Sequence, residues 1–585
     1  MAEKIVKKKF GDVEIDAIYR ETRRPMPVGE IKKTKESVDG LDEKSLEGAS
    51  LGFCAEFNQR TYLSAPGIIC EQDIPVKLRD GTIIYTDIYR PENETNIPVI
   101  ISWSYFGKRP GDGFDEWQII GVPPGTVSRM AKFESPDPGF WCRNGYAVAN
   151  VDPRGTGHSQ GDVDMFGTQD GRDGYDFVEW IATQHWCNGK VGMSGNSGVA
   201  MTQWRIAAEQ PPHLACIAPW EGTGDIYRES LFEGGIPALG FNNFITSSLI
   251  GLGYVDDNVA MAMKYPFINA YWEDKIPKWD KIRCPLYTTV CWQHMHLRGS
   301  MEGFRKSRTT KKWLRCHREF EWPDTYSVAA LQDLKLFYDR YLKGINNGWE
   351  LTPRIRLEVM DAFEYDFQTN RPEKELPLAR TQYKKLYLDA ATHSCSFEPF
   401  AKESKVSYEG KEGLTTFDVK FTEDTEITGY MKLHLWVEAE GNDDMDLFIN
   451  IQKLDAGGKW LPTTVLGEPH PGAWGKIRVS RRALDEKLST AFQPVQAHRK
   501  DEKLKPGEIV PIDIEIYPHS RIWHKTQQLR VQVAGHYVRE GWFEPFSWET
   551  NNKGNHIIHT GGKHDSYLQV PVIPPKYQAG DYVYR

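Results

Sequence analysis

The central part of the chain alternates short apolar runs with segments of helical periodicity. The apolar runs lie at residues 99–103, 146–152, 190–195 and 214–219, and the helical spacing at 171–184 and 198–209. Strands and helices alternate in this way when helices cover both faces of a parallel sheet. The sequence therefore predicts an α/β core, entered through a hairpin that turns at Asp80-Gly81.

Beyond about residue 350 the helical periodicity gives way to apolar residues that recur every second position. Such runs occur at 431–437, 512–516 and 529–533, separated by turn-rich spacers. This pattern predicts an antiparallel β-sandwich.

A chain of 585 residues is long enough for several domains. We expect an N-terminal arm, a core in two parts interrupted by a helical cap insertion, and a C-terminal sandwich. The expected boundaries are 1–57, 58–221, 222–280, 281–348 and 349–585 in that order.

Composition and charge exclude several classes of protein. The formal net charge is −9 and the basic residues are spread along the chain, so no nucleic-acid surface is expected. No run approaches the ~18 apolar residues of a membrane span, and the basic N-terminus lacks the apolar stretch of a signal peptide. We expect a cytoplasmic protein with buried, reduced cysteines, whose N-terminal arm could mediate a homodimer.

The most informative stretch is VGMSGNSGVAMTQW, residues 191–204. A predicted strand runs through a sharp turn directly into a predicted helix, which is the context of a nucleophile elbow. Gly195 and Gly198 flank Ser197 with the small residues that such a turn needs. Ser197 is therefore the predicted nucleophile. Ser194 is its rival, and a turn without chemistry is the alternative.

Several blocks around this turn resemble the CocE/NonD hydrolase family, which includes cocaine esterase and Xaa-Pro dipeptidyl-peptidases. They are NGYAVANVDPRGTGHSQGD (144–162) and WIATQHWCNGKVGMSGNSG (180–198). The resemblance runs from about residue 70 to the end. It implies an α/β-hydrolase core, a helical cap and a C-terminal jelly roll. One departure is local, since Gly198 and Ala200 stand where the family usually has Tyr and Gly.

By the same resemblance Tyr105, in ISWSYFGK (101–108), would donate its hydroxyl to the oxyanion. It follows a predicted strand on the edge of the sheet where ligands bind. The second donor would be the backbone N–H of Gly198. The alternative for Tyr105 is an ordinary aromatic residue of the pocket.

The general base should be a histidine that follows a late strand of the sheet. His317 ends the predicted strand KKWLRCH (311–317) and is our choice by position, although the family's run at this place is absent. His294 and His296, after the preceding strand, are its rivals.

The acid is harder to assign, because the family's Asp is missing from Cys291-Trp292-Gln293-His294. Glu221 follows the strand before and lies closest to its end, so we prefer it. Asp225 and Asp324 are the alternatives. The buried carboxylate would hold the imidazole in the right tautomer.

No metal or other cofactor is expected. His294 and His296 are two possible ligands without a third at credible spacing. We expect them instead to line the substrate site together with Trp220 and Trp292.

These residues predict a serine hydrolase that forms an acyl-enzyme on Ser197 and releases it with water. A small ester is the favoured substrate, since no acidic anchor for a peptide amine can be placed. Two alternatives stay open: an acyltransferase or other biosynthetic enzyme on the same site, and an inactive hydrolase-fold binding protein.

Overall fold

The computed structural model describes residues 3–25, 57–110, 117, 120–538 and 548–575. The chain divides into two compact units. The first comprises Met1–Ser230, Leu239–Arg315 and Glu319–Pro353. The second comprises Leu231–Ala238, Cys316–Arg318 and Arg354–Arg585.

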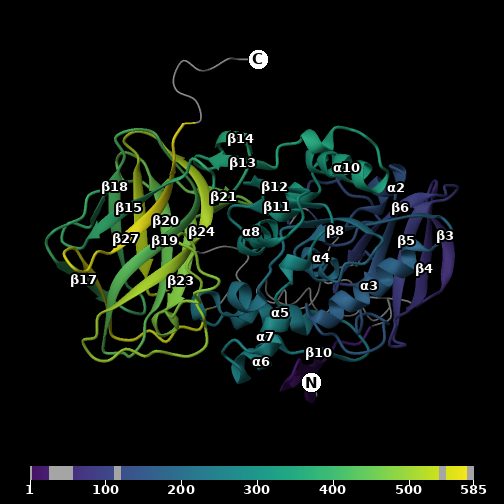
Figure 1. The fold of residues 1–585 in the computed structure, drawn as a ribbon, viewed down its shortest axis with the longest axis horizontal. Coiled ribbons are helices and arrows are strands. Elements are labelled where there is room, and N and C mark those ends of the chain that lie inside the picture. The colour runs from purple at the N-terminus through teal and green to yellow at the C-terminus, as the bar shows by residue number, and fades with distance from the viewer. Residues whose placement is uncertain (1–2, 26–56, 111–116, 118–119, 539–547, 576–585) are drawn as a thin grey trace, which may run out of the picture. The chain divides into compact units, whose positions relative to one another are not determined.

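A mixed sheet forms the centre of the first unit (Figure 1). Its strands, in spatial order, are β3 (Arg60–Ala65), β4 (Ile68–Lys77), β5 (Ile83–Pro91), β7 (Ala147–Asp152), β6 (Ile97–Trp103), β8 (Cys187–Asn196), β9 (Leu214–Trp220) and β11 (Leu286–Cys291). The strands from β7 to β11 in this order are parallel, and β3, β4 and β5 are antiparallel. β12 (Lys312–His317) follows next to the start of β11, where the Leu286 N–H donates to the Lys311 carbonyl. The predicted parallel α/β core is confirmed.

Helices cover both faces of this sheet, and alternate residues of one strand face different helices. Val99 and Ile101 of β6 pack with α3 and α4, whereas Ile100 between them packs with α10. This is why the parallel strands are apolar without interruption. The helices are α2 (Pro138–Arg143), α3 (Thr168–Ala182), α4 (Gly198–Ala208), α8 (Leu297–Lys306), α9 (Glu321–Thr325) and α10 (Val328–Leu342), followed by the short turn η4 (Trp349–Leu351). Among the described residues, no helix is long and apolar enough to cross a bilayer.

The segment between β9 and β11 interrupts the alternation and carries mainly short helices. Its elements are η1 (Tyr227–Leu231), η2 (Glu233–Gly235), α5 (Leu239–Ser248), β10 (Tyr254–Asp256), α6 (Asn258–Lys264), α7 (Ala270–Asp274) and η3 (Trp279–Lys281). We retain the cap boundaries expected at 222–280 as a proposal.

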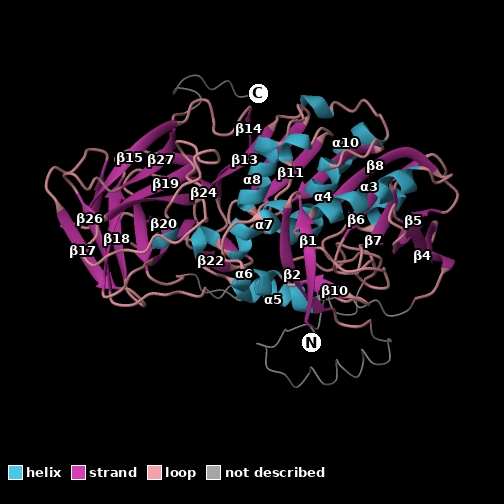
Figure 2. Cartoon of the chain, turned by 60° about the horizontal axis from the view of Figure 1, so that its bottom comes forward, coloured by secondary structure: helices cyan, strands magenta, loops and turns pink. Residues whose placement is uncertain are grey.

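The described part of the N-terminal arm forms a hairpin on this segment. β1 (Glu3–Phe10) pairs with β2 (Val13–Glu21), and β2 pairs in turn with β10 (Figure 2). The Arg20 guanidinium adds an ion pair of 2.6 Å to Asp257. The arm is therefore part of the first unit, held by backbone hydrogen bonds to a segment more than 230 residues away.

The second unit consists mainly of antiparallel strands in two sheets (Figure 1). One sheet contains β13 (Ile355–Met360), β14 (Asp366–Glu373), β15 (Gln382–Asp389), β17 (Ser404–Glu409), β19 (Thr425–Glu440), β24 (Val510–Trp523), β26 (Asn555–Thr560) and β27 (Tyr567–Ile573). The other contains β16 (Ser394–Ser396), β18 (Leu414–Lys420), β25 (Gln528–Ala534), β20 (Asp446–Leu454) and β23 (Ala473–Arg478). A short hairpin of β21 (Thr463–Val465) and β22 (Glu468–His470) and the turn η5 (Val479–Arg481) complete it.

The two sheets share one apolar core. Leu433 and Leu435 of β19 and Ile514 of β24 belong to the same buried cluster as Val531 and Val533 of β25. These are the alternating positions from which a sandwich was predicted, and the mostly-β C-terminal region is confirmed. The jelly-roll topology stays a prediction.

Candidate active site

Ser197 occupies a strained turn between β8 and α4. Its backbone angles are φ 52° and ψ −125°, which side-chain-bearing residues adopt only where the surroundings enforce them. Gly195 has φ 130°, and a Cβ there would lie 2.4 Å from Val199 Cγ1 and 2.7 Å from the Glu134 carbonyl oxygen. Ser197 is partly exposed, while the residues on either side of it are buried. This is the geometry of a nucleophile elbow.

The imidazole within hydrogen-bond distance of Ser197 is that of His296, which lies between β11 and α8. Its Nε2 is 3.0 Å from Ser197 Oγ, and its Nδ1 is 2.7 Å from Thr223 Oγ1. Burial lowers the pKa of His296 well below its usual value; the neighbouring His294 lowers it further, and the charge of Glu221 opposes both. The ring is therefore neutral at pH 7 and can accept the serine proton.

The structure places His296, and not the predicted base His317, within hydrogen-bond distance of Ser197 Oγ. His317 is buried at the end of β12 and belongs to the second compact unit. β11 and β12 are both late strands of the sheet, so a histidine after either of them meets the expected position. The rival pair His294 and His296 contains the residue that reaches Ser197.

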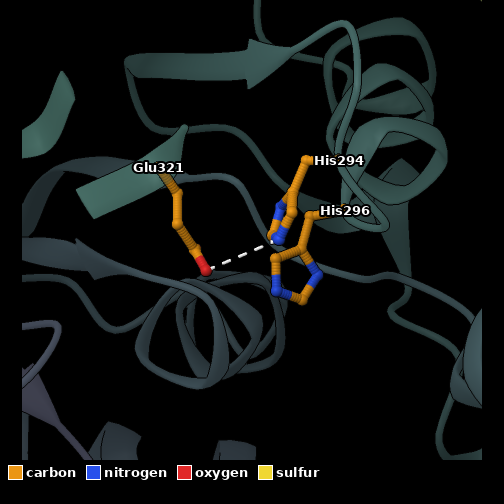
Figure 3. A group of neighbouring side chains, drawn as sticks. All are labelled: His294, His296 and Glu321. Atoms are coloured by element: carbon orange, nitrogen blue, oxygen red, sulfur yellow. Dashed lines mark ion pairs between the residues drawn. The ribbon is translucent and has the colours of Figure 1, made fainter. Parts of the chain in front are cut away.

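Glu221 follows β9 directly and reaches an imidazole, but the imidazole is that of His294. Glu221 Oε2 lies 3.2 Å from His294 Nδ1. The opposite ring nitrogen, Nε2, lies 3.6 Å from Glu321 Oε1 (Figure 3). The amide of Asn196, next to the serine, donates to Glu321 Oε2 at 3.0 Å. Glu221 acts on His296 through its charge and not through a direct hydrogen bond.

The two other candidate acids are engaged in ion pairs. Asp225 pairs with Arg228 at 2.7 Å. Asp324 accepts from Arg315 Nη1, also at 2.7 Å. Neither carboxylate is directed at a histidine in these contacts, so the structure gives no support to either as the acid.

A further carboxyl group, that of Glu134, borders the serine. Glu134 is buried and accepts from the indole N–H of Trp322 at 3.3 Å. Burial raises the pKa of Glu134 to about 8, although hydrogen bonds from Trp322, from the Ser197 side chain and from the Gly198 N–H oppose that rise. At pH 7 the group is mainly the neutral acid.

Glu321 shares this environment. Burial raises the pKa of its carboxyl well above the usual value, and the charges of Glu134 and Glu221 raise it further. Three buried carboxyl groups therefore lie near one another beside two imidazoles. Such like-charge groupings are typical of functional sites.

The structure does not support Tyr105 as an oxyanion donor. Its hydroxyl accepts the Phe166 N–H at 3.0 Å, and the Asp170 carboxyl group lies close enough to act on it electrostatically. Burial, with the charge of Asp170, raises the pKa of the phenol well above its usual value. The Tyr105 hydroxyl is thus engaged in a hydrogen bond within the buried core. The role of the Gly198 N–H as an oxyanion donor stays a prediction.

The two tryptophans predicted at the substrate are both buried. Trp220 belongs to the core cluster of α10 and stacks edge-on against Tyr287, with ring centroids 5.4 Å apart. Trp292 is fully buried. For Trp220 these contacts indicate a packing role, whereas His294 and His296 do lie at the serine.

Four site residues were missed by sequence reasoning: Glu134, Asn196, Thr223 and Glu321. Asn196 could have been found from its place beside Ser197, and Glu321 from its position shortly after β12. Glu134 and Thr223 lie in irregular segments, where no periodicity indicates which way a side chain points.

Comparison with known proteins finds related hydrolases. The profile of the X-Pro dipeptidyl-peptidase S15 family matches residues 80–253, and that of the X-Pro dipeptidyl-peptidase C-terminal non-catalytic domain matches residues 347–569. Cocaine esterase from Rhodococcus sp. (strain MB1 Bresler) is 25% identical over 379 residues, 54% of this chain and 62% of that protein. A putative serine esterase from Mycobacterium bovis is 31% identical over 172 residues, 29% of this chain and 27% of its own. These matches thus span less than two thirds of either relative.

A solved structure extends the likeness over nearly the whole chain. The CocE/NonD family hydrolase from Staphylococcus aureus superposes with a TM-score of 0.82 at 35% sequence identity. The match covers 86% of this chain and 94% of that one. Both sequence and fold are therefore shared along almost the full length of that protein. The chain belongs to the CocE/NonD family of hydrolases.

Proposed function

We propose that this protein hydrolyses a carboxylic ester of a small organic molecule through an acyl-enzyme on Ser197. The observation that carries the proposal is the 3.0 Å contact between Ser197 Oγ and His296 Nε2 at a strained strand-to-helix turn. A nucleophile and a base within hydrogen-bond distance, with the base held by a third group, are the requirements of such catalysis.

In the first step His296 Nε2 takes the hydroxyl proton while Ser197 Oγ attacks the ester carbonyl. The Gly198 N–H, at the start of α4, is the proposed donor to the oxyanion. The imidazolium returns its proton to the leaving alkoxide. A water molecule then repeats the sequence on the acyl-enzyme and restores the serine.

In a Ser-His-Asp triad one aspartate both orients the imidazole and supplies negative charge. Here Thr223 and Glu221 would each perform one of these two functions. Thr223 Oγ1 holds Nδ1 of His296 and so fixes the orientation of the ring. Glu221 supplies negative charge that raises the pKa of His296 against the effect of burial. Glu221 acts on His296 through its charge alone, so we expect a weaker base than in a triad with a direct carboxylate.

The names of the relatives support an ester substrate. One is a cocaine esterase and another a putative serine esterase. A second candidate has its own observation: Glu134, Glu221 and Glu321 gather carboxyl groups near Ser197, and a substrate ammonium among them would favour their ionised forms and pair with them. This would favour an α-amino ester or a peptide, in agreement with the matched X-Pro dipeptidyl-peptidase profile.

Two assays test these proposals. A fluorophosphonate probe should label Ser197 in the wild type and not in Ser197→Ala, which separates an active enzyme from an inactive binding protein. Turnover of p-nitrophenyl acetate, alanine p-nitrophenyl ester and alanyl-proline p-nitroanilide then ranks the substrate classes. If Ser197 is labelled and none of the three substrates is hydrolysed, but the acyl group is transferred to an added alcohol, the acyltransferase is favoured.

We also propose that the protein forms a homodimer and is located in the cytoplasm.

A further inference from the structure

Three buried side chains of the site converge on one point. His294, His296 and Glu321 each direct one possible ligand atom to a place where these atoms lie within 4.8 Å of one another (Figure 3). Two imidazoles and one carboxylate form a ligand set that holds zinc with one open position. The sequence alone did not indicate this group, because the third ligand follows His296 only after a helix and a strand.

Two of the three side chains are also held by a hydrogen bond at their other polar atom. His296 Nδ1 lies 2.7 Å from Thr223 Oγ1, and Glu321 Oε2 accepts from Asn196 Nδ2 at 3.0 Å. His294 Nδ1 lies 3.2 Å from Glu221 Oε2, an ion-pair distance without hydrogen-bond geometry. Outer contacts of this kind fix the tautomer and orientation of metal ligands. They leave Nε2 of both rings and Oε1 of Glu321 facing inward. This is a second observation, independent of the clustering itself.

A metal ion would draw these ligand atoms slightly closer together. Tetrahedral zinc sets its ligand atoms roughly 3.3 Å apart, whereas His294 Nε2 lies 3.6 Å from Glu321 Oε1 and all three atoms lie within 4.8 Å of one another. The carboxyl groups of Glu134 and Glu221 lie close enough to act electrostatically on Glu321. A divalent cation would favour the ionised form of these carboxyl groups in this buried place.

We propose that His294 Nε2, His296 Nε2 and Glu321 Oε1 bind a divalent transition metal of the zinc type, and that the metal-bound form is inactive as a serine hydrolase. His296 Nε2 has one lone pair. A metal that takes this pair prevents the ring from accepting the proton of Ser197, whose Oγ lies 3.0 Å from the same nitrogen. The inhibition rests on the proposed function, whereas metal binding does not.

Isothermal titration with Zn²⁺, after treatment with EDTA, tests the site without any need for activity. One Zn²⁺ should bind per chain to the wild type and to Ser197→Ala, because the serine is not a ligand. His294→Gln should weaken binding at least ~100-fold, and Glu221→Gln, which removes an outer contact, about 10- to 100-fold. His213→Gln is the matched control, because His213 pairs with Glu179 at 2.7 Å on the surface of the same unit.

Near-ultraviolet circular dichroism checks that each variant is folded, and Glu221→Gln still tests the site if His294→Gln does not fold. The proposal is overturned if the wild type and Ser197→Ala bind no Zn²⁺, or if folded His294→Gln binds as tightly as His213→Gln. In the wild type, Zn²⁺ should lower ester turnover at least ~10-fold, with full recovery on adding EDTA. Binding in Ser197→Ala without any wild-type hydrolysis would leave the metal site standing and reject the serine chemistry.

Discussion

Both compact units bury ion pairs of opposite sign, such as Lys108 with Asp152 at 2.6 Å in the first and Arg478 with Asp446 at 2.7 Å in the second. The first unit also places buried carboxyl groups beside one another, because Glu134 and Glu321 lie close enough to oppose each other's ionisation. In the second unit the cluster between the sheets is apolar. Burying like charges costs folding free energy that opposite pairs regain in part. The neighbouring carboxyl groups therefore lower the free energy of unfolding of the first unit at its candidate active site.

The largest loss of turnover is expected at Ser197, in the first unit. Ser197→Ala should reduce kcat on a p-nitrophenyl ester by roughly 10⁵- to 10⁶-fold, because no other group can form the acyl-enzyme. The melting temperature should stay within a few degrees. Ser194→Ala, in the preceding strand β8, is the control. Loss of activity in Ser194→Ala alone would move the nucleophile.

The next prediction distinguishes His296 from His317, which position in the sequence alone could not do. His296→Ala should lower kcat by about 10⁴-fold or more, since the serine then lacks a base. His317→Gln, in the second unit, should lower it less than ~10-fold. Stopped-flow or single-turnover measurements give both values. The reverse order would restore His317 as the base and break the comparison between the units.

Glu221 and Glu438 are carboxylates that each lie beside a histidine, one in each unit. We expect Glu221→Gln to reduce kcat roughly 100-fold, less than for a carboxylate bonded directly to the catalytic ring, because Glu221 acts on His296 through its charge alone. Glu438, which is half-buried in the second unit and lies 2.8 Å from His559 Nε2, is the matched control. Glu438→Gln should leave kcat unchanged. A larger loss in Asp225→Asn or Asp324→Asn than in Glu221→Gln would reassign the acid.

The pH profile should report the neutral acid beside the serine. Glu134 has a pKa of about 8, so it is uncharged below that pH and carries a negative charge above it. A negative charge there opposes the developing oxyanion, and kcat/KM should fall about tenfold per pH unit above that value. On the acid side the low pKa of His296 should keep the profile flat through pH 6.5. Glu134→Gln should remove the alkaline decline; an unchanged decline would assign it to another group.

The smallest effect on turnover is expected at Tyr105. Because its buried hydroxyl accepts the Phe166 N–H, Tyr105→Phe should cost about 1–3 kcal/mol of unfolding free energy and change kcat less than ~10-fold. Urea denaturation and steady-state kinetics measure the two quantities. A loss of ~100-fold or more in kcat with unchanged stability would return Tyr105 to the oxyanion hole.

Much of the fold could be predicted because burial on both faces leaves a strong signal in a parallel strand. The runs at 99–103 and 146–152 and the alternation at 431–437 each correspond to an observed strand, β6, β7 and β19. Ser197 could be predicted for a related reason, since Gly195 is required where a Cβ would collide with Val199. In these places local geometry restricts the residue type.

The partners of Ser197 could not be predicted in the same way. Whether His296 or His317 reaches the serine depends on the path of a loop after a strand, and loops carry no periodicity. Glu221 was placed at the correct edge of the sheet, but its neighbouring ring could not be named. For Tyr105, position after β6 agrees with the family, but position alone could not indicate that its hydroxyl accepts the Phe166 N–H.

The hairpin at the N-terminus has a consequence for engineering this protein. Because β2 supplies the strand that pairs with β10, and Arg20 pairs with Asp257, the segment between β9 and β11 is completed by residues from the other end of the unit. A graft that exchanges only 222–280 for that of another hydrolase would separate two halves of one three-stranded sheet. The transferable module is the discontinuous pair of segments, residues 3–25 together with the insertion, and libraries aimed at new substrates should vary both at once.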